Sequence, residues 1–505
     1  MENTHQEMSR NLDRTKKPVS PIRRLFHHSA IYSISTSIQR LQGLIMTPIY
    51  TSPLYLPQMS DYSNYGLVYT FIAFMNFVYL FGMDSAFLRY YFLGKESKKT
   101  VFSTSFGVLV LSGLVTSALI FVFARPLAEV ILFSGELANF IKLAALILFF
   151  DTIGNLPFLI LRAEERAISF TVFRIMRFSF ELILNIIFVV VLKRGVEGIL
   201  QANIIASLLN LVIMSPIAIK YLNFSFKPSL LKEMVVFGLP FLPNGIAFMI
   251  IEVIDRFLVT DYLGKDVLAF YHANYKFASV LLLLVVGFRN AWQPFFLKIS
   301  EQKEAPATYS RILNYYLFAA GLIIVGMTFF IKDILTFYYF NDFYLLWPRY
   351  WPGIDFIPWI LLSYFFYGIY VIFTPAFYIT KKSQYMVLFT GTGAILNIVT
   401  NIILLPRIGI WGAVIATVAA YLSMFLLIYF ISQKLYPIPV NLKSLLGVFL
   451  TIGLGYLIYY IIGPNFLFRA IIFVLLGVFA FFTALSASER KGLILSLTDR
   501  IKVKK

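Results

Sequence analysis

Ionisable side chains interrupt several long apolar stretches of this sequence, where each charge costs roughly 3 kcal/mol unless it faces a cavity or a partner. In the first stretch, Arg40 shares a helical face with Ser33, Ser37 and Thr47 and lies near the middle. A cation at the centre of a polar stripe is difficult to explain as packing. The pattern predicts that Arg40 lies on the wall of a water-filled cavity.

Two arginines share a face with a carboxylate further along the chain. Arg174, Arg177, Glu181 and Asn185 are spaced by three and four residues, which places them on one side of a helix. Arginine supplies a bidentate fork that suits phosphate oxygens. Both arginines also lie close enough to one end of their stretch to reach lipid headgroups instead. Their alignment with Glu181 favours a cavity.

Lys276 is a third cation of this kind, because it shares a helical face with His272 and Ser279 in another apolar stretch. Arg289 lies on the opposite side of that stretch and Arg89 at the end of its own, so both also fit snorkelling to the headgroups. A cavity lined by such residues attracts phosphate groups and repels organic cations. The predicted binding set for an anionic ligand is Arg40, Arg89, Arg174, Arg177, Lys276 and Arg289.

The composition indicates the class of protein in which these residues lie. The 505 residues are 59% apolar and only 13% charged, which excludes a water-soluble globular protein. The absence of cysteine excludes disulfides and thiolate catalysis, and four histidines that form no cluster argue against a metal site. The sequence therefore predicts an all-α integral membrane protein that binds no metal and no nucleic acid.

Apolar stretches bounded by charged residues, proline, glycine or asparagine predict fourteen membrane-spanning helices. Lysine and arginine divide unequally between the two sides, with 28 on the side of the termini and nine on the other. The excess places both termini in the cytoplasm. The expected divisions are a basic cytoplasmic tail at 1–28, an N-terminal lobe at 29–222, a C-terminal lobe at 223–436, two added helices at 437–487 and a basic cytoplasmic tail at 488–505.

Short echoes indicate that six spans are repeated. Asn185 and Asn397 each lie between leucine and isoleucine, and each is followed by the same spacing of small residues, namely Gly195, Gly198 and Ala202 in the first copy and Gly409, Gly412 and Ala416 in the second. A weaker echo pairs Gly82 and Ala86 with Gly287 and Ala291. Copies separated by an even number of spans insert in the same orientation, so the two predicted six-helix lobes are parallel repeats around a central cavity.

Several ordered motifs resemble those of bacterial polysaccharide-biosynthesis exporters of the O-antigen type, which flip lipid-linked oligosaccharides. The resemblance extends over nearly the whole chain, although each motif is short. The motifs are Pro48-Ile-Tyr50-Thr51, Tyr65-Gly66, Ala86-Phe-Leu-Arg89-Tyr90, Leu161-Arg162-Ala163-Glu164, Phe237-Gly238-Leu239-Pro240-Phe-Leu-Pro243 and Asp255-Arg256-Phe257. The family belongs to the multidrug/oligosaccharidyl-lipid/polysaccharide exporter superfamily, so the resemblance implies two lobes in a V shape that alternate access across the bacterial cytoplasmic (inner) membrane.

The resemblance also implies the substrate, a polyprenyl-pyrophosphate-linked oligosaccharide whose headgroup enters the cavity while its tail stays among the membrane lipids. Glycan polymerase or ligase machinery is the partner that such a flippase implies. No cofactor is expected. Coupling to a proton gradient, a sodium gradient or the membrane potential remains open, with Asp151 and Glu181 as proton carriers, or Asn244, Asn397 and Thr417 as sodium ligands.

Two other functions remain as alternatives. A cation-coupled multidrug exporter of the MATE type would require acidic residues to dominate the cavity, whereas here cations outnumber Asp151 and Glu181. A membrane glycan polymerase or glycosyltransferase would require a large outer loop with catalytic residues, and the longest outer loop, 332–352, offers only Asp333 and Asp342. We find no phosphate-binding glycine loop or nucleophile elbow, so the sequence predicts a transporter and not an enzyme.

Overall fold

The computed structural model describes residues 42–502 except residues 165, 224, 340–342, 381, 383 and 464. Most of the first expected span, with Arg40, therefore lies outside the described residues. Within the described residues the regular structure is helical apart from two short antiparallel strands, β1 (Tyr338–Tyr339) and β2 (Phe343–Tyr344). The prediction of an all-α membrane protein is confirmed at this level.

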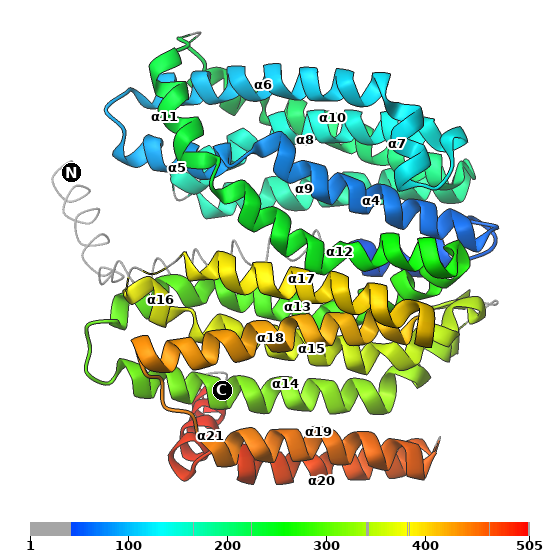
Figure 1. Cartoon of the computed structure of the whole chain (residues 1–505), viewed down its shortest axis with the longest axis vertical. Coiled ribbons are helices and arrows are strands. Elements are labelled where there is room, and N and C mark those ends of the chain that lie inside the picture. Colours follow the sequence, from blue (N-terminus) through cyan, green and yellow to red (C-terminus); the bar gives the residue numbers. More distant parts are fainter. Residues whose placement is uncertain are drawn as a thin grey trace, which may run out of the picture.

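The first helix group comprises the helices from α3 to α11, which pack around α8 (Figure 1). Short breaks separate several of them, including a 3₁₀ turn, η1, and a π-helical segment, η2. Their bounds are α3 (Thr47–Thr51), α4 (Met59–Leu80), α5 (Met83–Leu93), α6 (Lys98–Val122), α7 (Ala124–Ile131), η1 (Gly135–Leu137), α8 (Ala138–Ala163), α9 (Ala167–Asn185), η2 (Ile186–Val191), α10 (Gly195–Tyr221) and α11 (Pro228–Gly238).

The second helix group comprises α12 to α18, with α15 and α18 at its centre. Its elements are α12 (Phe241–Leu263), α13 (Lys265–Ile299), α14 (Ala305–Thr336), the 3₁₀ segment η3 (Pro348–Phe356), α15 (Ile357–Phe373), α16 (Pro375–Ile379), α17 (Tyr385–Ile408) and α18 (Trp411–Leu435). Three further helices, α19 (Leu442–Ile462), α20 (Phe466–Ala484) and α21 (Ala487–Lys502), follow it.

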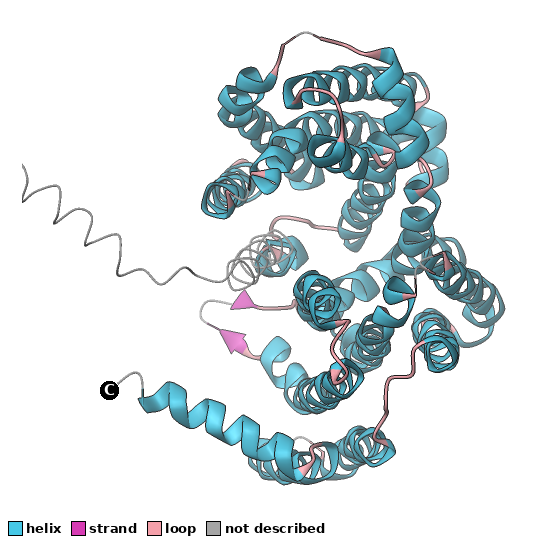
Figure 2. Cartoon of the chain, turned by 90° about the vertical axis from the view of Figure 1, so that its left-hand side faces the viewer, coloured by secondary structure: helices cyan, strands magenta, loops and turns pink. Residues whose placement is uncertain are grey.

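The two groups are joined mainly through α4, which packs against α12 and α13. Figure 2, which looks roughly along the helices, shows the groups as neighbouring bundles. The helices α19 and α20 pack against α14 at the far side of the second group (Figure 1).

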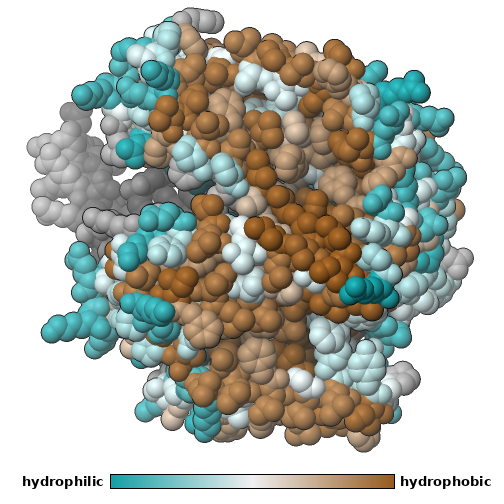
Figure 3. Space-filling model, in the orientation of Figure 1, coloured by the Kyte–Doolittle hydropathy of each residue, from teal (hydrophilic) through white to brown (hydrophobic). Residues whose placement is uncertain are grey.

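Eleven described helical segments are long and apolar enough to cross a membrane. The helices α9 and α12 take the places of the fifth and seventh expected spans, but their ionisable residues lie close together near the middle, at Arg174, Arg177 and Glu181 in α9 and at Glu252, Asp255 and Arg256 in α12. The surface also indicates a membrane protein. A broad apolar band crosses the middle of the molecule, and polar side chains gather at the two ends of the helices (Figure 3). The chain is a multi-pass membrane protein, and the count of fourteen spans stays a prediction.

The stronger echo in the sequence corresponds to two hairpins that are built alike. Gly195 begins α10 with a φ of +56°, and Gly409 precedes α18 with a φ of +61°. In both cases the glycine three residues later, Gly198 or Gly412, lies against backbone atoms of the preceding segment. Glycine is needed at all four places, because a side chain would meet strain or backbone there.

The weaker echo is not reproduced in the structure. Gly82 lies at the break between α4 and α5 with a φ of +77°, and a Cβ atom there would come within 2.0 Å of the carbonyl oxygen of Gly238. Gly287 lies inside α13, where a Cβ atom would meet nothing within 4 Å. The similar spacing of small residues thus serves different purposes at these two positions.

Candidate functional site: a polar cavity and a buried amide cluster

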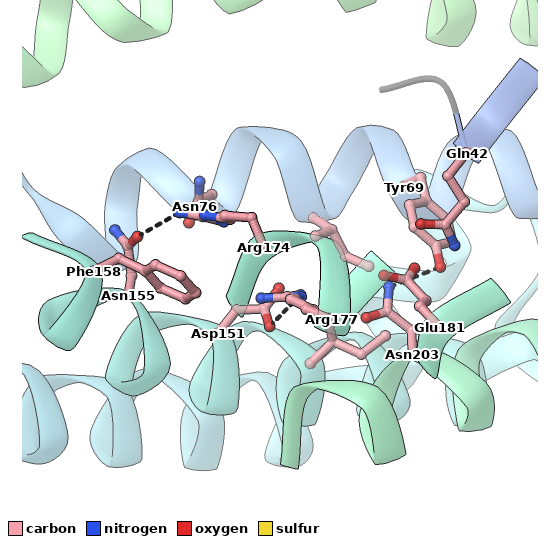
Figure 4. Close-up of a pocket in the computed structure, with 12 residues that line it drawn as sticks. Gln42, Tyr69, Asn76, Asp151, Asn155, Phe158, Arg174, Arg177, Glu181 and Asn203 are labelled. Carbon is pink, nitrogen blue, oxygen red and sulfur yellow. Dashed lines mark hydrogen bonds and ion pairs between the residues drawn. The ribbon is translucent and has the colours of Figure 1, made fainter. Parts of the chain in front are cut away.

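A polar cavity of about 380 Å³ lies within the first helix group, between α4, α8, α9 and α10 (Figure 4). Its volume falls in the range of small-ligand pockets. The lining combines charged, carboxamide and aromatic side chains, namely Gln42, Tyr69, Ile72, Asn76, Ile147, Asp151, Asn155, Phe158, Arg174, Arg177, Glu181 and Asn203.

Arg177 holds the centre of this polar cavity. Its Nη2 atom donates to Asp151 Oδ1 at 2.7 Å and to Ser207 Oγ at 3.3 Å, which ties α9 to α8 and α10. The Arg177 side chain is 12% exposed and that of Asp151 is 28% exposed. Asp151 is therefore the more accessible member of this ion pair.

Arg174 lies one helical turn before Arg177 on the same wall. Its guanidinium carbon is 4.0 Å from the ring centroid of Phe158 and 5.3 Å from that of Phe170. Its Nη2 atom also approaches Asn155 Oδ1 at 3.4 Å. Stacking between aromatic rings fixes the plane of the guanidinium, which prepares it for directional hydrogen bonds.

Carboxamides and a tyrosine extend the cavity beyond Glu181. Asn203 Nδ2 donates to Tyr69 Oη at 2.9 Å, so α10 and α4 meet at this end of the polar cavity (Figure 4). Asn185, which the sequence places on the same face, donates to the Glu181 carbonyl oxygen and accepts from Tyr50 Oη at 2.7 Å. Asn185 therefore links α9 to α3 and does not line the cavity.

A second polar feature lies in the second helix group, and we call Asp255, Tyr271, Asn397, Asn401 and Thr417 the buried amide cluster. Tyr271 Oη donates to Asp255 Oδ2 at 2.5 Å and also lies within hydrogen-bond reach of Thr417. Asn401 Nδ2 donates to Asn397 Oδ1 at 3.1 Å. All five residues are 0% exposed, although each carries a polar group and the surrounding helices are apolar.

The two parts of this cluster lie on helices that pack against each other, α12 and α17. The two helices run in the same direction (Figure 1), and Ile251 Cδ1 lies 3.1 Å from the position that a Cβ atom of Gly393 would take. Asp255 and Asn397 each follow one turn later. Asp255 Oδ1, Asn397 Nδ2 and Asn401 Oδ1 have no hydrogen-bond partner. Since amide oxygen and nitrogen positions are interchangeable by a flip, these side chains can turn several oxygens toward one cation.

Comparison with known proteins identifies the family. Residues 56–339 match the polysaccharide biosynthesis protein family. The chain belongs to this family. A search of curated proteins found no match.

Solved structures show which fold this polysaccharide biosynthesis protein shares. The lipid II flippase MurJ in an inward closed conformation has a TM-score of 0.73 at 19% identity, over 89% of this chain and 97% of MurJ. An outward-facing multidrug resistance MATE family transporter of the MOP superfamily has a TM-score of 0.60 at 14% identity, over 83% of this chain and all 100% of the other. A MOP superfamily transporter from Pyrococcus furiosus has a TM-score of 0.61 at 14% identity, over 83% and 98% of the two chains. The protein has the fold of this superfamily.

The predicted site residues of this family member divide between several places. Arg174, Arg177, Asp151 and Glu181 converge on the polar cavity. Among the described residues its lining holds as many carboxylates as guanidinium groups, so the expected excess of positive charge is not established by them. Arg40, which would add a cation from the first span, lies outside the described part of the chain.

Lys276 lies on α13, outside the lining of the polar cavity, in a cage of tyrosines. Its Nζ atom is 4.6 Å from the ring centroid of Tyr65, 5.1 Å from that of Tyr62 and 6.0 Å from that of Tyr50. It also donates to Tyr65 Oη at 3.2 Å. Aromatic faces replace part of the lost hydration of the cation. Tyr65 in turn packs against Tyr69 of the polar cavity, with centroids 4.8 Å apart.

The outlying cations occupy positions near aromatic rings. Arg89 is exposed on α5 and stacks over Phe237 at 4.5 Å, and Arg289 on α13 donates to Tyr367 Oη at 2.8 Å. Neither residue lines the polar cavity. Of the sodium candidates, Asn397 and Thr417 belong to the buried amide cluster, whereas the side chain of Asn244 lies outside the described part of the structure.

Sequence reasoning did not select Asp255 as a coupling residue. The available signal was a carboxylate in the middle of an apolar stretch, but Glu252 and Arg256 flank it at the four-residue spacing of a local ion pair. In the structure Arg256 donates to Thr70 Oγ1 at 2.7 Å, on α4. The carboxamides Asn76, Asn155 and Asn203 were likewise missed as cavity residues, because polar amides are common between packed membrane helices.

Proposed function

We propose that this protein carries a polyprenyl-pyrophosphate-linked oligosaccharide across the cytoplasmic membrane by alternating access and catalyses no reaction. The observation that supports this function best is the pair Arg174 and Arg177 in a polar cavity embedded among apolar helices. Membership of a polysaccharide biosynthesis family and the fold shared with a lipid II flippase agree with a lipid-linked glycan.

The chemistry of binding follows from the contacts of the two arginines. A pyrophosphate oxygen replaces Asp151 on Arg177, while Arg174 is already oriented by its aromatic neighbours. Carboxamides such as Asn155 and Asn203 then face the first sugar, whose hydroxyl groups both donate and accept hydrogen bonds. The polyprenyl tail stays among the lipids.

The remaining parts of the proposal concern the first span and the lobes. Arg40 adds a cation to the cavity, and Lys276 meets the headgroup when the tyrosine cage opens. The two helix groups act as the two six-helix lobes of a fourteen-helix transporter in a V-shaped arrangement, with both termini in the cytoplasm. Glycan polymerase or ligase machinery receives the product on the outer side.

Sodium at the buried amide cluster is the coupling ion that we propose. Sodium prefers oxygen ligands, and Asp255, Asn397, Asn401 and Thr417 supply carboxylate, amide and hydroxyl oxygens. Three polar atoms without hydrogen-bond partners at fully buried residues support this assignment. Asp151 and Glu181 are the competing carriers of a coupled proton.

A second candidate function is a cation-coupled multidrug exporter. The equal number of carboxylates and guanidinium groups among the described cavity residues favours this alternative more than the sequence did. An organic cation would bind at Asp151 and Glu181, so the two functions require opposite responses to loss of the arginines.

Flux measurements in proteoliposomes test which of these two functions the protein has. Purified protein is reconstituted and loaded with a lipid-linked oligosaccharide, and its appearance in the opposite leaflet is followed by an impermeant glycan-binding probe. We expect Arg177→Gln to lower flux at least about tenfold, since one charge-assisted hydrogen bond is worth about 1.5 kcal/mol or more. The matched control is Arg125→Gln, whose side chain is 81% exposed and pairs with Glu129 four residues later.

Unchanged flux in Arg177→Gln and Arg174→Gln would refute the anionic-headgroup site. Uptake of organic cations that survives in these variants and is lost in Asp151→Asn would establish the exporter instead. For coupling, replacing sodium by choline at constant pH should slow wild-type flux but leave Asp255→Asn unaffected. Equal flux of the wild type in both salts would exclude sodium coupling.

A further inference from the structure

Hydrogen bonds between described residues of the two helix groups gather at one end of the bundle, where α4 begins and α17 ends (Figure 1). On the side of the first group they involve residues 48–70. We call this end the clamp end. The hydrogen bonds between the groups are therefore unevenly distributed along the helices.

Arg349 makes the densest set of these contacts. It lies in η3, in the second group, and its guanidinium reaches the segment that joins α3 to α4. Nη1 donates to the Pro57 carbonyl oxygen at 2.7 Å, and Nη2 donates to those of Leu56 at 2.6 Å and Thr51 at 3.1 Å. One side chain thus binds three carbonyl oxygens of the other group.

Thr51 is the last residue of α3, and the final carbonyls of a helix lack partners and carry partial negative charge. A guanidinium is therefore well suited to this place. Trp347 adds a similar contact, because its Nε1 atom donates to the Pro48 carbonyl oxygen at 3.1 Å. Ser52 N bonds to Ile49 O, one residue short of the regular partner, so the Pro48 carbonyl is available for the tryptophan.

The start of α13 reinforces the same end. Lys265 Nζ donates to Asn64 Oδ1 at 2.8 Å, and its own carbonyl oxygen accepts from the Ser63 hydroxyl group. Tyr350, next to Arg349, packs edge-on against Tyr62 of α4 with ring centroids 5.4 Å apart. These contacts surround Arg349 with the parts of both groups that must separate if this end opens.

We infer that Arg349, supported by Trp347, is the clamp that holds the clamp end closed and so sets the side to which the cavity opens. All of its acceptors here are backbone carbonyls, which do not titrate at any physiological pH. Release exposes them to water at the membrane surface, where they are hydrated at little cost, so the clamp is reversible. The inference stands on these contacts alone and does not depend on the proposed substrate.

Distance measurements between spin labels test the clamp. The natural chain contains no cysteine, so two introduced cysteines are the only labelling sites. Leu54, which is 67% exposed, and the exposed Arg407 at the end of α17 report on the clamp end. The exposed Lys99 and Lys298, at the starts and ends of α6 and α13, report on the opposite end.

We expect Arg349→Ala to raise the ratio of long to short distances for the Leu54→Cys/Arg407→Cys pair about tenfold, which corresponds to about 1.4 kcal/mol. The Lys99→Cys/Lys298→Cys pair should shorten in the same variant. Arg349→Lys should show a smaller change, because an ammonium group lacks the planar fork. Arg125→Ala, an exposed arginine on α7, should leave both distributions as in the wild type.

Unchanged distributions at the clamp end in Arg349→Ala would overturn the inference. If that variant does not fold, Trp347→Phe decides, since it keeps an aromatic ring at this position and removes the N–H donor to Pro48. A shift toward longer distances at the clamp end in Trp347→Phe supports the clamp. Wild-type distances in Trp347→Phe and Arg349→Lys together would refute it.

Discussion

Replacing Asp151 by asparagine tests in one step whether Arg177 serves an anionic ligand. Asp151 Oδ1 accepts from Arg177 Nη2 at 2.7 Å and so occupies the place that a phosphate oxygen would take. Asparagine keeps the shape but removes the negative charge. At about 6 Å from a bound phosphate and an effective dielectric of about 40, that charge repels the ligand by about 1.4 kcal/mol. We therefore expect Asp151→Asn to bind a pyrophosphate headgroup about tenfold more tightly.

Titration of purified protein in nanodiscs with undecaprenyl pyrophosphate, followed by tryptophan fluorescence, measures the effect. Glu129→Gln is the control, because Glu129 is 58% exposed and pairs with Arg125 on α7. Flux is expected to fall even as affinity rises, since a headgroup that meets no competing carboxylate is released slowly. Weaker binding in Asp151→Asn would refute the reasoning and favour a site for organic cations.

Three further predictions concern the cations, the fold and the topology. Arg40→Ala and Lys276→Ala should each abolish glycan flux with the protein still inserted, as measured in proteoliposomes, and wild-type flux from both would contradict the cationic cavity. Gly82→Ala should lower the free energy of unfolding by about 2 kcal/mol or more, because its Cβ atom would collide with Gly238 at a positive φ, whereas Gly287→Ala inside α13 should be neutral in the same thermal unfolding assay. A single cysteine at position 54 should react with an impermeant thiol reagent outside intact cells and one at position 99 should not, and the reverse pattern would invert the proposed orientation.

The predictions that rest on periodicity along a single helix agree with the structure. Hydropathy predicted helices long enough to cross a membrane, and helical spacing placed Arg174, Arg177 and Glu181 on one wall, where the structure has them. Such spacing is a local property, fixed by about 100° of rotation per residue. It carries no information about which neighbouring helix a face meets, so the contact between Arg177 and Asp151 did not follow from it.

The aromatic surroundings of Lys276 could not be predicted from the sequence. Its polar helical face suggested a cavity, but the packing of α13 against α4 surrounds it with Tyr62 and Tyr65 instead. Aromatic residues three residues apart on α4 look in the sequence like ordinary core or lipid-facing positions. Only the approach of the two helix groups converts them into a cage for a cation.

The adjacent residues Asp255 and Arg256 connect the proposed ion site with the interface between the helix groups. Asp255 faces the buried amide cluster, and Arg256 Nη1 donates to Thr70 Oγ1 of α4 at 2.7 Å. Consecutive residues of a helix point about 100° apart, so one turn of α12 serves both places. On the proposed coupling, we expect a cation that draws Asp255 toward Asn397 to rotate this turn and to change the contact of Arg256 with α4.

Sodium should therefore shift the distances between spin labels at positions 54 and 407 in the wild type, and Asp255→Asn should remove the shift. Thr70→Val should reduce the shift while leaving sodium uptake, measured with a radioactive tracer, near the wild-type level. This combination separates transmission from binding, because Thr70 lies in the other helix group and touches no member of the buried amide cluster in the described contacts. A full sodium-dependent shift in Thr70→Val would mean that the ion acts on the helix groups by a route that does not pass through Arg256.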